Sequence, residues 1–224
     1  MKKFLPARTA SLWPRLWMRW AGLSPLGRTA CAIAALGQPP SYGRVPISRF
    51  GPCGYIAPSA KIYHDDIRLN RWCFIGDRVN IYQDRGGGAV TFGTDVHVHR
   101  DSTLQIGDGG VIDIGAHTHI QPRCQMVAYK GAITIGSGCQ IAPHCAFYAY
   151  DHGFAAGTPV RKQPIKTKGG IVVGQEVWLG FGVIVLDGVT IGDDAVVGAG
   201  SVVTSSIPPG CVAAGNPAHV LKKR

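Results

Sequence analysis

The sequence predicts an all-β chain wound into a parallel solenoid, with a short N-terminal helical segment and a protruding loop near residues 150–170. An apolar residue recurs every six positions, residues 150–170 break this period, and the first 50 residues show helical spacing instead. The clearest run of the period is Val173, Leu179, Val185, Ile191, Val197 and Val203.

A six-residue period fits strands and excludes a helix. Six is a multiple of the two-residue strand period, so every apolar anchor can face the same way. Positions six apart on an α-helix differ by about 240°. A strand of about 30 residues would far exceed the usual length of roughly 3–10, so the chain must turn. Stacked coils of short strands would then bury the anchors in one internal core.

The same register recurs earlier in the chain. Its anchors are Ile56, Ile62, Ile75, Ile81, Phe92, Val98, Leu104, Ile114, Ile120, Met126, Ile135, Ile141 and Phe147. Three hexapeptides make a triangular coil of 18 residues, and longer intervals mark insertions. Glycines beside the anchors, among them Gly174, Gly180, Gly192 and Gly198, are expected to form the corners.

Charge and composition bound the class of protein. The chain has 224 residues with 46% hydrophobic and 16% charged, which disfavours disorder. Residues 1–64 hold nine of the 23 basic residues and no Asp or Glu, so the net charge of +10 belongs to this segment. The remainder, with 14 basic and 13 acidic residues, argues against a nucleic-acid-binding body. We divide the chain into a basic helical segment, 1–50, and a solenoid domain, 51–224.

The N-terminal segment predicts two short helices. The first carries Trp13, Leu16, Trp17, Trp20 and Leu23 at helical spacing, with Arg15 and Arg19 on another face. Pro14 would be tolerated only in its first turn, and a second helix is expected over 26–36. We expect a cap on the solenoid end. The alternative is an interfacial helix that contacts an anionic membrane through residues 1–36. The apolar run 30–36 is too short and too far along the chain for a signal peptide.

The seven cysteines contain no C-x-x-C motif. They therefore predict neither a zinc nor a redox site, and a reduced, cytoplasmic location is expected. Cys139 and Cys145 fall at small-residue corner positions and are interpreted as packed thiols.

The C-terminal third resembles the hexapeptide-repeat acyltransferase family, and most closely its sugar O-acetyltransferase branch, which includes galactoside, maltose and exopolysaccharide acetyltransferases. The resemblance rests on Val-Trp-Leu-Gly at 177–180, Gly-Val-Thr-Ile-Gly at 188–192, the run 198–204 and Ala-Gly-Asn-Pro-Ala at 214–218. It covers about residues 55–222. It implies a left-handed parallel β-helix, acetyl-CoA as co-substrate and a homotrimer with its sites between adjacent solenoids.

His152 is the candidate general base. It opens the irregular loop directly after a regular coil, which would hold it firmly beside a cleft, and histidine titrates near neutral pH. The resemblance implies that it deprotonates the acceptor hydroxyl, with direct transfer and no covalent enzyme intermediate. Asp151 is expected to contact the acceptor, and Glu176 is a candidate for orienting the base. A nucleophilic Cys145 paired with His144 is disfavoured because neighbouring strand residues face apart.

The resemblance also implies a site for the carrier. Trp178 would lie beside the reacting centre, Phe181 near the thioester and Ala199 along the pantetheine arm, with room left by Gly180. Thr204 and Ser205 would lie near the nucleotide. Ser205 and His219 stand where the family often has Lys and Arg, which leaves less positive charge for the phosphates of coenzyme A. Lys222 and its basic neighbours are expected to supply that charge instead.

The acceptor site is expected to include Gln125, Tyr129 and Tyr148 from the coils before His152, since polar and aromatic groups suit a sugar. His97 with His99, and His117 with His119, could each grip a metal. Metal-binding members of this fold use histidines five apart, a spacing missing here, so no metal is expected and surface hydrogen bonding explains these pairs.

The sequence thus predicts an acetyl-CoA-dependent O-acetyltransferase acting on a small or lipid-linked sugar hydroxyl in polysaccharide biosynthesis. We expect the protein to lie in the cytoplasm and to have no nucleic-acid partner. If it contacts a membrane, we expect that contact at the inner membrane face. Two alternatives stay open: acetylation of an antibiotic or amine acceptor, and a non-catalytic solenoid that only binds.

Overall fold

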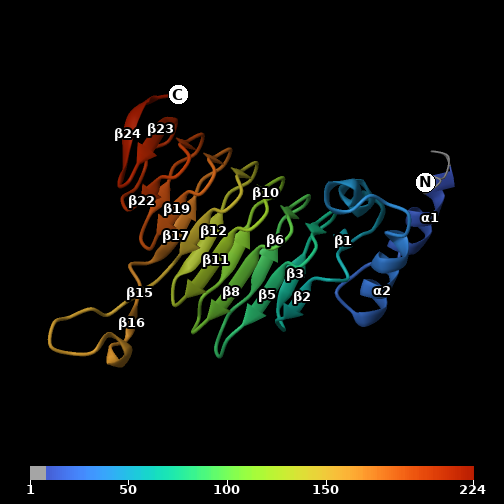
Figure 1. Ribbon diagram of the computed structural model, residues 1–224, viewed down its shortest axis with the longest axis horizontal. Helices are drawn as coiled ribbons and strands as arrows, with labels where there is room; N and C mark the ends of the chain where they lie inside the picture. The colour runs from blue at the N-terminus through green and yellow to red at the C-terminus, as the bar shows by residue number, and fades with distance from the viewer. Residues whose placement is uncertain (1–8) are drawn as a thin grey trace.

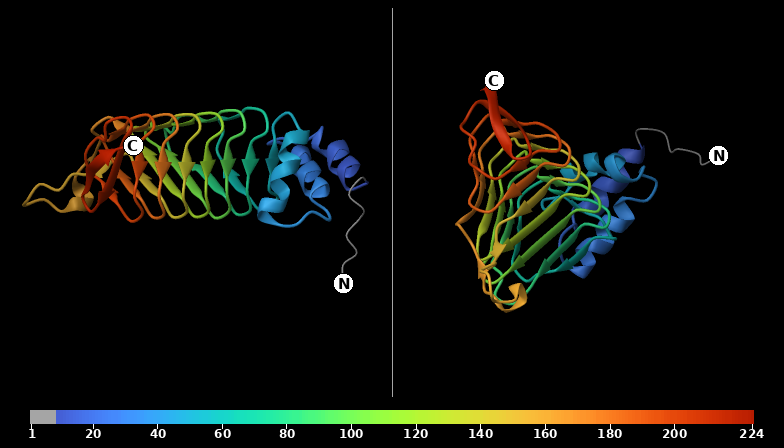
Figure 2. Two further views of the ribbon diagram at one scale, coloured as in Figure 1. Left: turned by 90° about the horizontal axis from the view of Figure 1, so that it is seen from above. Right: turned by 60° about the vertical axis from the view of Figure 1, so that its left-hand side comes forward.

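Three parallel β-sheets form the walls of a left-handed β-helix in the computed structural model, which describes residues 9–224 and their side chains from residue 12 (Figures 1 and 2). Within each wall, every strand pairs with the equivalent strand of the next coil. The all-β solenoid predicted from the six-residue period is confirmed.

The nine-stranded sheet consists of β1 (Tyr55–Ile56), β4 (Phe74–Ile75), β7 (His97–Val98), β10 (His119–Ile120), β13 (Gln140–Ile141), β18 (Trp178–Leu179), β21 (Val196–Val197), β23 (Cys211–Gly215) and β24 (Ala218–Lys223). The seven-stranded sheet consists of β2 (Lys61–Tyr63), β5 (Asn80–Gln83), β8 (Thr103–Gly107), β11 (Gln125–Tyr129), β14 (Ala146–Tyr148), β19 (Ile184–Leu186) and β22 (Val202–Val203). The six-stranded sheet consists of β3 (Ile67–Leu69), β6 (Val90–Phe92), β9 (Ile112–Ile114), β12 (Ala132–Ile135), β17 (Gly170–Val173) and β20 (Thr190–Ile191). Among the described strands of these three sheets, β24 alone runs antiparallel to its neighbour, β23.

The sequence anchors form the core. Every anchor from Ile75 to Val203 is at most 1% exposed, and the anchors of successive coils lie opposite one another, as Val98 does to Ile120. Ile62, in the first coil, is half-buried and packs against the same core. Burial of each large aliphatic side chain contributes about 1.5–3 kcal/mol, so the repeat itself drives the stacking.

The glycines after the anchors have a different role from the one predicted. Gly174, Gly180, Gly192 and Gly198 do not adopt positive φ. A Cβ on Gly180 would instead lie 2.7 Å from the backbone nitrogen of Ala199 in the next coil. Coils packed about 4.8 Å apart leave no room there. The left-handed turn residues fall two positions later in the corner, as with His144 (φ +63°) and Gly200 (φ +70°).

Three edges join the walls, and we number them in chain order. Edge 1 leads from the nine- to the seven-stranded sheet and includes 142–145, 180–183 and 198–201. Edge 2 leads from the seven- to the six-stranded sheet and includes 149–169, 187–189 and 204–206. Edge 3 leads back to the nine-stranded sheet and includes 136–139 and 174–177.

The protruding loop predicted near residues 150–170 is confirmed, and it carries secondary structure of its own. β15 (Asp151–His152) pairs antiparallel with β16 (Ile165–Lys166), and a single 3-10 turn, η2 (Val160–Lys162), lies between them. This hairpin leaves the prism at edge 2 near its C-terminal end (Figure 1).

The N-terminal segment covers the other end of the prism (Figure 2). It comprises α1 (Thr9–Met18), α2 (Pro25–Ala34) and a 3-10 segment, η1 (Ser41–Phe50), which the sequence did not predict. Met18, Cys31 and Ala34 belong to the same core as the first coil. Packing as a cap is therefore confirmed. Residues 1–8 of the predicted basic segment lie outside the described residues.

The helix boundaries differ from the prediction. α1 ends at Met18, before Trp20 and Leu23, and holds Pro14 in its interior rather than in its first turn. α2 begins at Pro25, where the Ser24 hydroxyl caps it by accepting from the Gly27 N–H at 3.1 Å. None of the described helices is long and apolar enough to cross a membrane.

Candidate functional site

His152 lies where the regular coil gives way to the hairpin. It sits on β15 opposite Ile165 of β16 and is exposed. The edge of its ring approaches Tyr150, with 5.8 Å between the ring centroids. Strand pairing holds the His152 backbone and the Tyr150 ring lies beside the imidazole, while the exposure of His152 leaves it open to a substrate.

Neither carboxylate considered for His152 pairs with it. The Asp151 carboxylate forms an ion pair with Lys168, with 3.3 Å between Oδ2 and Nζ, and so joins the two arms of the hairpin. Glu176 lies at edge 3, whereas His152 lies at edge 2, so Glu176 does not orient His152 of its own chain. The expected contact of Asp151 with the acceptor stays a prediction.

A polar and aromatic strip leads along the seven-stranded sheet to His152. The Tyr148 hydroxyl donates to Gln125 Oε1 at 2.9 Å. The rings of Tyr129 and Tyr150 lie 5.4 Å apart, and burial raises the pKa of Tyr150. The structure thus brings the predicted residues Gln125, Tyr129 and Tyr148 into one strip.

Gln105 extends this strip and was missed from the sequence. Its side-chain amide donates to the Tyr129 hydroxyl at 3.0 Å and to the Asp84 carboxylate at 3.1 Å. Gln105 lies opposite Val127 in the pairing of β8 with β11. The strand register could have indicated it, since alternate residues of both strands face outward.

Three of the predicted carrier residues stack along edge 1. Gly180 lies against Ala199 of the next coil, and the Phe181 carbonyl accepts from the Gly200 N–H at 2.8 Å. Phe181 is 55% exposed, and its ring lies 5.0 Å from that of His144. His144 was considered only as a partner of Cys145, and its place beside Phe181 follows from coil stacking.

The other predicted carrier residues lie elsewhere. Trp178 is 55% exposed on the nine-stranded sheet. His219 and Lys222 lie on β24, at the C-terminal end of the same sheet. Thr204 and Ser205 lie at edge 2, after β22. The predicted carrier residues therefore occupy two edges and one wall rather than a single groove.

Within one chain, the candidate base and the candidate thioester site are separate. His152 lies at edge 2 and Phe181 at edge 1, and the seven-stranded wall lies between them. Transfer of an acyl group requires the reacting atoms to be within about 3–3.5 Å. The two candidate residues of one chain therefore do not meet at a common site.

His97 and His99 are buried and His119 is half-buried beneath η1, which corrects their expected surface location, whereas His117 is exposed. The His97 and His119 rings stack 4.3 Å apart, and His97 Nε2 lies 3.1 Å from Asp95 Oδ1. Tyr42 covers His99 at 4.5 Å. Burial lowers the pKa of His97 and His119, and lowers that of His99 to about 4. Residues 9–224 contain no group of three or more side chains placed to hold a metal ion.

The cysteines are all free, and Cys139 and Cys145 are buried as predicted. The Cys145 thiol donates to the Gly180 carbonyl at 3.3 Å and faces the core rather than His144. A hydrogen bond with the Cys145 thiol, together with burial, raises the pKa of Cys124. These thiols are packed groups.

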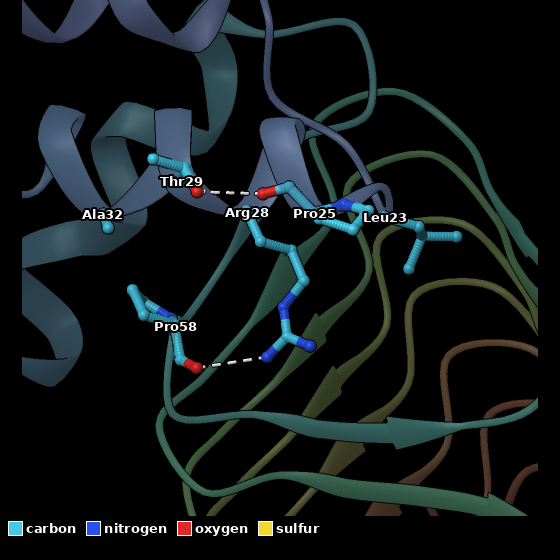
Figure 3. A pocket seen from close by; sticks show the side chains of 6 residues that line it. All are labelled: Leu23, Pro25, Arg28, Thr29, Ala32 and Pro58. Atoms are coloured by element: carbon cyan, nitrogen blue, oxygen red, sulfur yellow. Dashed lines mark hydrogen bonds between the residues drawn. The ribbon is translucent and has the colours of Figure 1, made fainter.

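A shallow concavity of about 470 Å³ lies between α2 and the first coil, at the opposite end of the prism from His152 (Figures 1 and 3). Arg28 crosses it and donates to the Pro58 carbonyl at 3.1 Å. The concavity belongs to the attachment of the cap, and we assign it no part in the chemistry.

A family model described as bacterial transferase hexapeptide (six repeats) matches residues 170–205. The galactoside O-acetyltransferase of Escherichia coli K12 is 53% identical over 53 residues, which cover 24% of this chain. This stretch spans about a quarter (26%) of the length of that relative.

Solved structures extend the likeness to most of the coils. The polySia-specific acetyltransferase NeuO is 28% identical with a TM-score of 0.59, over 72% of this chain and 65% of that one. AntD, an N-acyltransferase from Bacillus cereus, has a TM-score of 0.59 at 23% identity, over 68% of this chain and 80% of that one, and shows the fold alone. These findings confirm the resemblance to the hexapeptide-repeat acyltransferase family: the chain carries that family's repeat on its left-handed β-helix.

Proposed function

We propose that the chain transfers an acetyl group from acetyl-CoA to a hydroxyl of a sugar or polysaccharide precursor, with His152 as the general base. The observation that carries this proposal is the position of His152, exposed at the junction of coil and hairpin, at the end of the strip of Gln125, Tyr148 and Tyr150. Tyrosine rings and amides offer a sugar both stacking and hydrogen bonds. The similarity to a galactoside acetyltransferase supports the same class of acceptor.

The chemistry requires one proton transfer and one bond exchange. An imidazole nitrogen of His152 takes the proton of the acceptor hydroxyl as its oxygen attacks the thioester carbon. The carbon–sulfur bond then breaks, and the departing thiolate recovers the proton from the imidazolium. The acetyl group passes directly to the acceptor, so no covalent enzyme intermediate forms.

A donor for the developing oxyanion is available at edge 1. The Phe181 N–H donates to no backbone carbonyl of the described residues, whereas Gly180 and Gly182 on either side donate at 2.8 and 3.0 Å. A rigid backbone N–H aimed at developing negative charge is a strong contribution to catalysis in acyl transfer. We assign the Phe181 N–H to this role and the exposed Trp178 and Ala199 to the neighbouring carrier groove.

The separation of the two half-sites supports a homotrimer. A closed ring about an axis parallel to the prism would bring edge 1 of one chain against edge 2 of the next. His152 of one chain would then face Phe181 of its neighbour. The same arrangement would place the basic C-terminal strand, with Lys222, near the carrier phosphates, where Ser205 and His219 contribute no fixed charge.

The test is release of free thiol from acetyl-CoA with a panel of sugars, sugar nucleotides, amines and aminoglycosides. We expect His152→Ala to fold normally and to lose on the order of 10²–10⁴ in rate. His117→Ala is the matched control, because His117 is also exposed, with 63% of its side chain accessible, but lies in a turn at edge 3. An unchanged rate in His152→Ala would rule out the assigned base.

The acceptor panel separates the alternatives. Transfer to amines alone would replace the sugar by an amine or antibiotic acceptor. Failure to bind coenzyme A would favour the non-catalytic solenoid.

A further inference from the structure

Helix α1 has two apolar faces, and only one of them packs on the protein. Met18, Ala21 and Pro14 are buried against the cap and the first coil. Leu12 and Leu16, about 40° apart around the helix, face outward with exposed fractions of 68% and 56%. The helix therefore presents a second apolar stripe that nothing in the described chain covers.

Tryptophan side chains border this stripe. Trp20, immediately after the helix, is 73% exposed, and Trp13 is 43% exposed while its indole N–H donates to the Ile33 carbonyl at 2.8 Å. Leu26 and Leu36, at the two ends of α2, are 83% and 63% exposed. Contiguous exposed apolar patches mark interaction sites, and Leu12, Leu16 and Trp20 follow one another four residues apart.

Two arginines flank the stripe on its other side. Arg15 lies about 60° from Leu12 around the helix, and Arg19 lies in the turn directly after it. Arg15 stacks on Phe50, with 4.9 Å between guanidinium and ring centre. Arg19 has no ion pair among the described residues. No Asp or Glu occurs in residues 1–64, so no acidic group of the cap offsets either charge.

The other arginines in the described part of the cap are already engaged. Arg28 donates to backbone carbonyls of the first coil. Arg44 pairs with Asp77 at 3.1 Å, and Arg49 lies 3.4 Å from Asp95. Among the described residues of the cap, the two arginines with neither an acidic nor a carbonyl partner, Arg15 and Arg19, therefore lie beside the apolar stripe of α1, which gives that surface a mixed apolar and positive character.

We propose that the α1 outer face, defined as Leu12, Leu16 and Trp20 with Arg15 and Arg19, binds an anionic phospholipid bilayer. An amphipathic helix with tryptophan and leucine on one face and arginine beside it lies in the plane of the membrane interface. Its apolar side chains enter the acyl boundary by about 5–10 Å, and its arginines contact lipid phosphates. Indole rings favour this interface because they are apolar with a single polar N–H.

The fold places this surface away from the chemistry. The cap and the hairpin lie at opposite ends of the prism (Figure 2). β14, which precedes His152, is four strands from β2, a rise of about 19 Å at 4.8 Å per strand. A docked chain would hold His152 above the membrane, within reach of groups that extend from lipids rather than of the lipid surface itself.

A homotrimer would strengthen this membrane binding. This effect depends on the homotrimer that we infer under the proposed function. Rotation about an axis parallel to the prism keeps all three caps at one end, so three α1 outer faces could meet one membrane together. Linked weak contacts bind far more tightly than single ones.

The test is flotation of the full chain with phosphatidylcholine vesicles and with equimolar phosphatidylcholine and phosphatidylglycerol vesicles. We expect recovery with the mixed vesicles only, and its loss at high salt. Leu16→Glu with Trp20→Glu should lower partitioning by roughly tenfold or more. Arg15→Ala with Arg19→Ala should lower it by roughly 30-fold on anionic vesicles.

Tyr63→Glu is the matched control, because Tyr63 is 68% exposed near the same end of the prism but lies on β2. Circular dichroism and coenzyme A binding of each variant show whether folding and the carrier site are preserved, so failure here is distinct from failure of the proposed function. Absence of flotation, or equal flotation of all variants, would overturn the proposal. A change in oligomer mass in the α1 variants with unchanged flotation would assign the face to contact between chains, and would also overturn it.

Discussion

Asp187 fastens the hairpin that carries His152, and replacing it by asparagine should loosen that hairpin. Asp187 is 4% exposed at edge 2, directly after β19. Its Oδ1 accepts from the Gly170 N–H at 2.9 Å and from the Thr167 hydroxyl at 3.1 Å, and its Oδ2 accepts from the Lys168 N–H. Three donors of the returning arm thus converge on one buried carboxylate.

The cost of Asp187→Asn follows from these contacts. An amide has one acceptor oxygen, so its NH₂ group must face either the Lys168 N–H or the buried Gly170 N–H. Leaving a buried donor without a partner costs about 1–3 kcal/mol, and the remaining bonds lose the assistance of the charge. We therefore expect a loss of about 2–4 kcal/mol, concentrated in the hairpin because the anchors of the coils are untouched.

Hydrogen exchange measures this local effect directly. The Gly153 N–H donates to the Pro164 carbonyl at 3.0 Å inside the hairpin, so its exchange reports hairpin opening. A loss of about 2 kcal/mol should speed its exchange by roughly 30-fold. The kcat for acetyl transfer should fall with it, whereas the Kd for coenzyme A should hold, because the carrier edge is a separate part of the fold.

Asp193→Asn is the control for a general loss of stability. Asp193 also accepts from a backbone N–H of the preceding coil, that of Gln175 at 2.7 Å, but it is exposed and lies beyond edge 2. We expect little change in Gly153 exchange for this variant. If Asp187→Asn left Gly153 exchange and kcat unchanged, the reasoning about the buried carboxylate would be refuted.

Three further predictions follow from the structure. Burial lowers the pKa of His99 from 6.5 to about 4. Between these pH values the unfolded chain binds a proton at His99 that the folded chain does not bind. The free energy of unfolding is therefore at its full value above about pH 6.5 and should fall by up to about 3 kcal/mol as the pH drops from 6.5 to about 4. Urea unfolding across that window should show the slope, and His99→Phe should reduce it to the part that His97 and His119 contribute, whereas an equal slope in both proteins would contradict this cause. Gly180→Ala should destabilise the protein by about 1–3 kcal/mol, because the added Cβ would meet the next coil. The control Gly22→Ala has open space around the added Cβ, and its stability should stay within about 0.5 kcal/mol of the unsubstituted protein. Equal melting temperatures of the two variants would argue against the close approach at Gly180. Tyr148→Phe removes the hydroxyl bonded to Gln125 and should raise the KM for the acceptor by roughly 2–12-fold, with an unchanged Kd for coenzyme A. An unchanged KM would show that the strip is not part of the acceptor site.

The inward face of the solenoid could be predicted because its information is local. Anchors such as Leu179 and Val185 repeat along the sequence with the period of the coil, and each needs only an apolar neighbour above and below. The break in that period predicted the loop, and the loop in turn indicated His152. Alternation of strand residues was enough to predict that Cys145 faces the core and not His144.

The outward face could be predicted only in part, because its contacts join residues about one coil apart or more. The link between Gln105 and Tyr129 spans 24 positions, and that between Asp187 and Gly170 spans 17. Tyr42 of η1 packs over His99, although these two residues are still farther apart in the sequence. His99, which the sequence placed at the surface, is therefore buried. The N-terminal helix boundaries were also missed, since Pro14 is accommodated inside α1.

The sequence by itself determined the coil, its core, the position of the hairpin and the identity of the candidate base, since each of these follows from a period or from its interruption. Only the tertiary structure decided that the glycines after the anchors serve coil spacing, and that Phe181 and His152 lie on different edges. It also decided that α1 keeps an apolar face exposed. The physical reason is that periodicity specifies which way a side chain points, whereas coil stacking and cap docking specify what that side chain meets.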